Sequence, residues 1–105
     1  MIGMTQESLA SESNHTYQVW FERYLRKVDF EKQILNSARR GYLRYGMRVG
    51  YASAEYDRDA LMKVDSRFIE SLKVKYPDLK FKREPIKNLF SKEIGYNLTI
   101  SWDGE

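Results

Sequence analysis

The chain has no cysteine, a single histidine, only two prolines and no long hydrophobic run. Because cysteine is absent, disulfides, cysteine-ligated zinc sites and thiol nucleophiles are excluded. No apolar segment approaches the ~20 residues that span a bilayer. The polar N-terminal residues lack the basic start and apolar centre of a signal peptide. We therefore expect a cytoplasmic protein with no membrane partner.

The length and the composition predict one globular domain with a mildly basic charge. A chain of 105 residues, of which 42% are hydrophobic, can bury a core of its own. The net charge of +3 favours an encounter with an anionic partner without requiring one. We expect residues 1–15 to form a flexible N-terminal lead and residues 16–105 to form a single α+β domain.

Two segments, residues 42–51 and 96–102, alternate between apolar and polar side chains. This alternation is the period of a strand with one buried face. A third, shorter alternation starts after the turn at Pro77 and is expected to end at Pro85. The sequence thus predicts three strands, at about 42–52, 79–84 and 96–102.

The segment 17–40 has the spacing of an amphipathic helix, because large apolar residues recur at intervals of three and four. Thr16 or Asn14 can cap its start, and Gly41 marks its end. The pattern leaves open whether this segment is one bent helix or two. Its first apolar stripe comprises Tyr17, Trp20, Phe21, Tyr24, Leu25 and Val28.

Three further segments have helical character of different strength. A short helix is predicted from the N-cap Asp65 to Pro77, with an apolar side formed by Phe68, Leu72 and neighbouring residues. Residues 53–64 are compatible with a loop or a helical turn, and residues 86–93 suit a short helical turn.

The predicted order of elements is helix, strand, helix, strand, turn, strand. A right-handed crossover would make the first two strands parallel, and the last strand can return antiparallel beside one of them. This gives a small α+β fold, a three-stranded mixed sheet with helices packed on one face. The other face, which we name the basic sheet face, would carry Arg44, Arg48, Lys80, Lys82, Asn97, Thr99 and Ser101.

Histidine and carboxylate chemistry finds little support in the sequence. His15 lies in the polar lead without neighbouring ligand residues. An acidic cluster could hold a hard cation, but it lacks the glycine and the closing glutamate of a calcium loop, so a solvated loop is the preferred interpretation. The cluster consists of Glu55, Asp57, Asp59 and Asp65.

The glycines do not form a phosphate-binding loop. Gly41, Gly46 and Gly50 match neither a dinucleotide-binding motif nor a P-loop. On one strand face, Gly46 and Gly50 are expected to allow a bulge or the close approach of another backbone. With no Ser/His/Asp arrangement either, we predict that the protein is not an enzyme and needs no cofactor or metal.

The basic sheet face is the most defensible functional surface, with a solvated basic face as the alternative interpretation. Such a patch can contact phosphates. Nucleic-acid binders often add aromatic side chains on which bases stack, and among the aromatic residues of the predicted strands only Tyr42 is expected on the same face. The candidate residues for an anionic or nucleic-acid partner are Arg39, Arg40, Arg44, Arg48, Lys80 and Lys82.

The aromatic content indicates a second kind of surface. Two tryptophans, eight tyrosines and five phenylalanines exceed what so small a core needs. Tyrosine and tryptophan are enriched at interaction hot spots. We therefore expect exposed aromatic residues, with Trp20, Tyr24 and Tyr42 as candidates for binding a protein partner or a second copy of the chain.

Several stretches resemble small uncharacterised proteins of phages and prophages of Gram-positive bacteria. The resemblance covers about residues 29–102 and is carried by residues 37–42, 68–72, 79–82 and 98–102. It implies a phage-encoded accessory protein in the bacterial cytoplasm. Chains of this kind bind and block host proteins, including defence nucleases in the manner of anti-CRISPR proteins, or assist replication or assembly. The resemblance assigns no functional residue.

Our first hypothesis is a non-enzymatic, phage-encoded protein-binding module that modulates or inhibits a bacterial host protein. The alternative is a small nucleic-acid-binding protein that uses the basic sheet face. A third hypothesis is a self-associating phage assembly protein.

Overall fold

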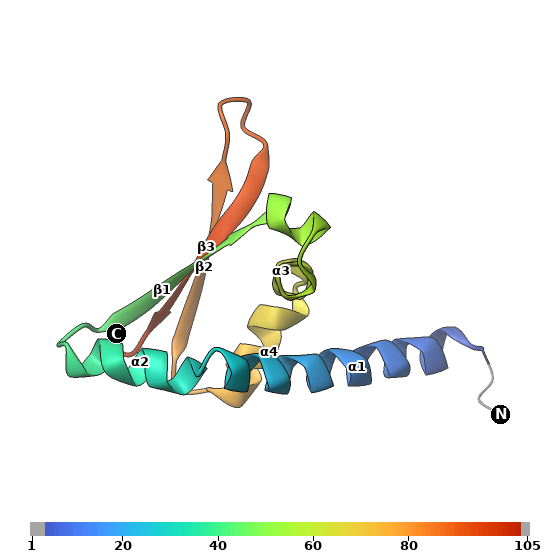
Figure 1. Ribbon diagram of the computed structural model, residues 1–105, viewed down its shortest axis with the longest axis horizontal. Coiled ribbons are helices and arrows are strands. Elements are labelled where there is room, and N and C mark those ends of the chain that lie inside the picture. The colour runs from blue at the N-terminus through green and yellow to red at the C-terminus, as the bar shows by residue number, and fades with distance from the viewer. Residues whose placement is uncertain (1–3, 104–105) are drawn as a thin grey trace.

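The computed structural model describes residues 4–103, apart from the side chain of Ser53. The α+β class and the predicted order of elements are confirmed (Figure 1). Along the chain lie α1 (Gln6–Lys27), α2 (Phe30–Arg39), β1 (Arg44–Gly50), the short 3-10 helix η1 (Tyr51–Glu55), α3 (Arg58–Val64), α4 (Arg67–Lys75), β2 (Lys80–Lys87) and β3 (Glu93–Ser101).

The sheet has the strand order β1-β3-β2. It is antiparallel throughout rather than mixed, because β3 pairs antiparallel with both of its neighbours. β1 and β2 run in the same direction, as a crossover connection predicts, but they lie at opposite edges and do not pair. The hairpin after β2 places β3 beside β2, and β3 lies on the side toward β1, so it occupies the position between them.

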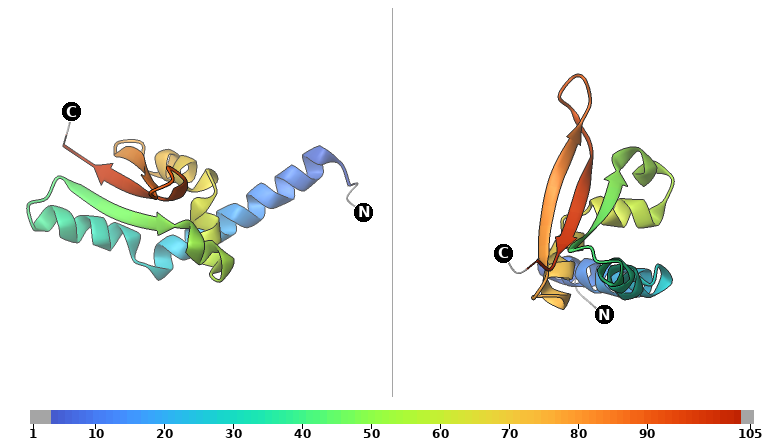
Figure 2. Two further views of the ribbon diagram at one scale, coloured as in Figure 1. Left: turned by 90° about the horizontal axis from the view of Figure 1, so that it is seen from above. Right: turned by 90° about the vertical axis from the view of Figure 1, so that its left-hand side faces the viewer.

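The helices cover one face of the sheet, as predicted (Figure 2). The expected stripe of α1 supplies much of the core, and Phe68 of α4 lies at its aromatic centre. The Phe68 ring contacts three rings of α1, with centroids 6.1–6.2 Å apart in tilted or edge-on geometry. The buried apolar residues of the core cluster are Tyr17, Trp20, Phe21, Tyr24, Leu25, Phe30, Val49, Phe68, Leu72, Tyr96, Leu98 and Ile100.

α1 begins about ten residues earlier than the sequence predicted. Thr5 caps the helix, and its side chain and that of Ser8 each accept from the other's backbone N–H. The expected lead is therefore helical from Gln6 onward and projects beyond the body of the molecule (Figure 2, left). The residues of this first part of α1 are mostly polar and form no apolar stripe, so the spacing of apolar residues did not predict a helix there. Residues 1–3 of that lead and residues 104–105 of the expected domain lie outside the described part of the chain.

The segment 17–40 contains two helices, which resolves the open alternative. Asp29 separates them in the left-handed conformation, with φ of 54°. α2 ends where the sequence predicted, because Gly41 has φ of +90° and donates to the Ala38 carbonyl. The next N–H, of Tyr42, donates to the Ser37 carbonyl, which completes a Schellman motif.

The expected helical turn at residues 86–93 is wrong, and β2 does not end at Pro85. β2 continues to Lys87, and residues 88–92 form the turn of the β2–β3 hairpin. The Asn88 side chain accepts from the N–H groups of Phe90 and Lys92, so it replaces the helical hydrogen bonds. Proline is tolerated in β2 because it is an edge strand.

The expected role of two glycines is also wrong. A Cβ at Gly46 or Gly50 would meet no atom within 4 Å, and the β1–β3 register has no bulge. The close backbone approach occurs instead at Gly95, where a Cβ would overlap the carbonyl oxygen of Val49. The space beside Gly46 and Gly50 is therefore open.

Candidate functional site

The basic sheet face has the predicted side-chain parity. Three rows of paired residues cross this face from β1 through β3 to β2. The rows are Arg44–Ser101–Lys80, Gly46–Thr99–Lys82 and Arg48–Asn97–Glu84. Figure 2 shows the helices on the opposite side of the sheet. The charged residues of these rows and Asn97 are exposed.

The basic residues of this face form two columns rather than one patch. We expected β1 and β2 to be neighbours, but β3 separates them. Two interstrand spacings place the columns roughly 10 Å apart. Between them run Asn97, Thr99 and Ser101 of β3, whose side chains can donate and accept hydrogen bonds. The arrangement is a polar floor between two walls, one formed by Arg44 and Arg48 on β1 and the other by Lys80, Lys82 and the acidic Glu84 on β2.

The two walls differ in how far their charge is compensated. On β2, Lys80 lies 3.5 Å from Asp103, and Lys82 lies 3.1 Å from Glu84. Within residues 4–103, no acidic side chain forms an ion pair with Arg44 or Arg48 on β1. The β1 wall therefore holds the stronger uncompensated positive charge.

Three further predicted residues lie beside the start of β1. Arg39 ends α2 and Arg40 is its C-cap, and both are exposed. Tyr42 follows with 60% of its surface exposed. The Schellman turn thus brings two cations and one aromatic ring next to Arg44 in the chain.

The expectation that Trp20 and Tyr24 are exposed is wrong. Only 8% of Trp20 and 7% of Tyr24 is accessible, and their rings stack 5.1 Å apart. α3 and α4 cover this part of α1, and the Trp20 indole N–H is satisfied by Asp59 on α3. The short helices α3 and α4 bury more aromatic surface than the sequence suggested.

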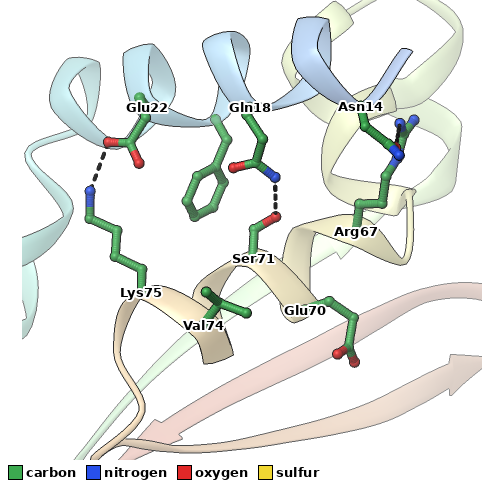
Figure 3. Close-up of a pocket in the computed structure, with 9 residues that line it drawn as sticks. Asn14, Gln18, Glu22, Arg67, Glu70, Ser71, Val74 and Lys75 are labelled. Atoms are coloured by element: carbon green, nitrogen blue, oxygen red, sulfur yellow. Dashed lines mark hydrogen bonds and ion pairs between the residues drawn. The ribbon is translucent and has the colours of Figure 1, made fainter. Parts of the chain in front are cut away.

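A groove of about 600 Å³ lies between α1 and α4 (Figure 3). Polar contacts bridge it at three levels: Asn14–Arg67 at 3.1 Å, Gln18–Ser71 at 3.0 Å and Glu22–Lys75 at 2.7 Å. These side chains satisfy one another and hold the two helices together. The groove is therefore better explained as a helix–helix contact than as a ligand site.

The acidic cluster is divided among separate structural contacts. Asp57 caps α3, Asp59 accepts from Trp20 and Lys27, and Asp65 pairs with Arg67 at 2.7 Å. Glu55 and His15 are exposed. Within residues 4–103, no three histidine, aspartate or glutamate residues lie together in a way that could hold a metal ion.

A charged cluster lies on the helix side of the sheet and was not predicted from the sequence. Arg83 lies at a position of β2 where the alternation predicts an apolar, helix-facing side chain. It stacks 4.7 Å over the Tyr96 ring and pairs with Glu93 at 3.2 Å. Tyr51 hydrogen-bonds both partners, and the Arg83 and Tyr51 contacts hold the pKa of Glu93 below its usual range. The signal in the sequence was the break in apolar alternation after Phe81. The cluster ties η1 to both strands of the hairpin.

The tip of the β2–β3 hairpin exposes two large apolar residues. Leu89 is 100% exposed and Phe90 is 89% exposed, and the hairpin projects away from the helices (Figure 1). Lys87 and Lys92 flank them. The sequence predicted a short helical turn at residues 86–93 and did not predict an exposed hairpin tip.

None of the helices within residues 4–103 has the length and apolar character needed to cross a membrane. Comparison of the chain with protein-family models, curated proteins and solved structures finds no significant match.

Proposed function

We propose that the protein is a small, non-enzymatic binding module that contacts single-stranded nucleic acid through its basic sheet face. The observation that carries this proposal is the pair of cationic columns on either side of a polar floor. Phosphates are the ligands that such a surface attracts. The polar side chains of β3 would hydrogen-bond sugar and phosphate oxygens, which positions a strand without reading its sequence.

The width of the surface favours one strand over a duplex. The columns lie roughly 10 Å apart, which is twice the spacing of neighbouring strands, so one phosphodiester backbone that runs along β3 would reach both columns. Arg44 and Arg48 would make the stronger contacts, because no acidic partner competes for them within the described residues. Tyr42, exposed just before β1, offers one stacking platform for a base. Arg39 and Arg40, exposed at the end of α2, would add positive charge near the start of β1.

The test is a pair of double variants with the same change in charge. Arg44→Glu with Arg48→Glu should abolish binding of a fluorescently labelled oligonucleotide while the circular dichroism spectrum and Tm stay unchanged. The matched control is Arg23→Glu with Arg26→Glu on the exposed side of α1. It should retain most of the affinity. Equal losses in both variants would show that net charge, not the sheet face, governs binding.

A second candidate is a phage-encoded module that modulates or inhibits a protein of the bacterial host. The exposed hairpin tip favours it, since Leu89 and Phe90 could anchor in an apolar pocket of a partner. Burial of Trp20 and Tyr24 removes two of the three residues expected to bind a protein partner, and Tyr42 remains exposed.

Affinity capture from a nuclease-treated Gram-positive lysate separates the two candidates. A partner protein retained by the native chain but lost with Leu89→Ser and Phe90→Ser would support the second. Recovery that disappears on nuclease treatment would support the first.

A further inference from the structure

β1 presents unpaired backbone groups along its outer edge. The Trp102 N–H donates to the Leu43 carbonyl at 3.1 Å. Because successive residues of a strand direct their backbone groups to opposite sides, this bond shows which residues of β1 bond to β3. Residues 45, 47 and 49 therefore bond to β3, and the N–H and C=O groups of residues 44, 46 and 48 point outward. Among the described residues, the one partner of these groups is the Ser37 hydroxyl, which donates to the Arg44 carbonyl at 3.0 Å. Gly46 and Arg48 offer a free donor and acceptor each within the described part of the chain.

The two edges of the sheet differ in how they are protected. On β2, the outward positions are 81, 83 and 85, because residues 80, 82 and 84 bond to β3. Pro85 lacks an N–H there, and lysines and Arg83 line the strand, which are common devices against edge pairing. β1 has no proline, and its charged side chains, Arg44 and Arg48, alternate with glycines; both Gly46 and Arg48 are exposed. β1 is thus the edge at which another strand can be added.

We propose that β1 pairs antiparallel with β1 of a second copy, about a two-fold axis at Met47. In this register Gly46 faces Arg48 of the other copy, and Arg44 faces Gly50. Each Gly46–Arg48 pair exchanges two backbone hydrogen bonds, and the two symmetry-related pairs double that number. The product is a continuous six-stranded sheet.

The side chains select this register among those that the outward groups permit. A shift by two residues in one direction places Arg48 opposite Arg48, and a shift in the other direction places Arg44 opposite Arg48. Like charges directly opposite are unfavourable. Only the proposed register, which overlaps all of β1, sets each arginine against a glycine. The open space found beside Gly46 and Gly50 leaves room for the guanidinium groups.

The remaining repulsion is diagonal, over roughly 7–8 Å. Because this separation is close to the Debye length of about 8 Å at physiological salt, the dimer should tighten as salt rises. Nucleic-acid binding has the opposite salt dependence, so the two associations can be told apart.

The absence of native cysteine permits a clean cross-linking test in the full-length chain. Met47→Cys should form a disulfide-linked dimer on mild oxidation, since its Cα atoms would lie about 4.5 Å apart in a non-hydrogen-bonded pair. Arg48→Cys should cross-link poorly, because residue 48 faces residue 46. Equal or reversed yields would overturn the register.

A charge series at Gly46 tests the same pairing without cysteine. By sedimentation equilibrium, Gly46→Glu should lower the dimer Kd about 2- to 30-fold through ion pairs with Arg48, and Gly46→Lys should raise it similarly. Lys82→Gln and Glu84→Gln on β2 make the same respective changes in net charge and should have little effect. A wild-type chain that stays monomeric at millimolar concentration and high salt would overturn the proposal.

Discussion

The indole N–H of Trp20 on α1 donates to the carboxylate of Asp59 on α3, with 2.7 Å between nitrogen and oxygen. The same carboxylate accepts from the Lys27 ammonium at 2.9 Å. These two contacts hold the pKa of Asp59 below its usual range, and the hydrogen bond from Trp20 has the largest effect. Asp59 is therefore the polar link that allows a tryptophan to be buried between α1 and α3.

Asp59→Asn should destabilise the protein by about 1–2 kcal/mol at neutral pH, because a charged acceptor is lost. A lowered folded-state pKa means that the stabilisation is present above the ordinary value of 3.8 and is lost as the pH falls further. Urea unfolding should therefore show a clear difference between wild type and variant at pH 7 and a smaller one near pH 3. The exposed Asp78→Asn is the control. An equal difference at both pH values would contradict this role.

Alkaline pH should destabilise the protein through buried tyrosines. Burial raises the pKa of Tyr96 from 10.0 to about 12. The folded state therefore keeps a proton that the unfolded chain releases, and stability should fall between pH 10 and 12, by up to about 1.4 kcal/mol per pH unit for this group. Tyr96→Phe should flatten that decline in urea midpoints. An unchanged slope would show that Tyr96 does not contribute to it.

Substitutions at two adjacent residues of β3 test the parity of the sheet. Ile100 is fully buried, so Ile100→Asp places a charge in the core and should prevent folding. Thr99 lies on the basic sheet face between Gly46 and Lys82, so Thr99→Asp should fold, with a Tm near that of wild type. A folded Ile100→Asp or an unfolded Thr99→Asp would reverse the assignment of faces.

The spacing of apolar residues predicted those features of the fold that depend on a strand or helix having one buried face. The alternation around Ile100 gave the correct parity of β3, and the spacing from Tyr17 to Leu25 gave the correct face of α1. The spacing did not predict the first turns of α1. These turns are polar and capped, and they have no apolar stripe because they project beyond the body of the molecule. Nor did it predict the order of strands, which depends on the hairpin turn at Asn88.

The candidate site was predictable in part for the same reason. Arg44, Arg48, Lys80 and Lys82 share the predicted face because parity is local to each strand. Their separation into two columns follows from strand order, which is not local. The burial of Trp20 depends on Asp59, 39 positions away in the chain, and no spacing rule connects the two.

The most direct test of the account is the salt dependence of nucleic-acid binding by the full-length chain. Fluorescence anisotropy would follow a labelled single-stranded oligonucleotide of mixed sequence at several potassium chloride concentrations. Four to six phosphate contacts predict a slope of log K against log salt between about −3 and −4. No binding at low salt, or an affinity independent of salt, would contradict the proposal that the basic sheet face binds the phosphate backbone.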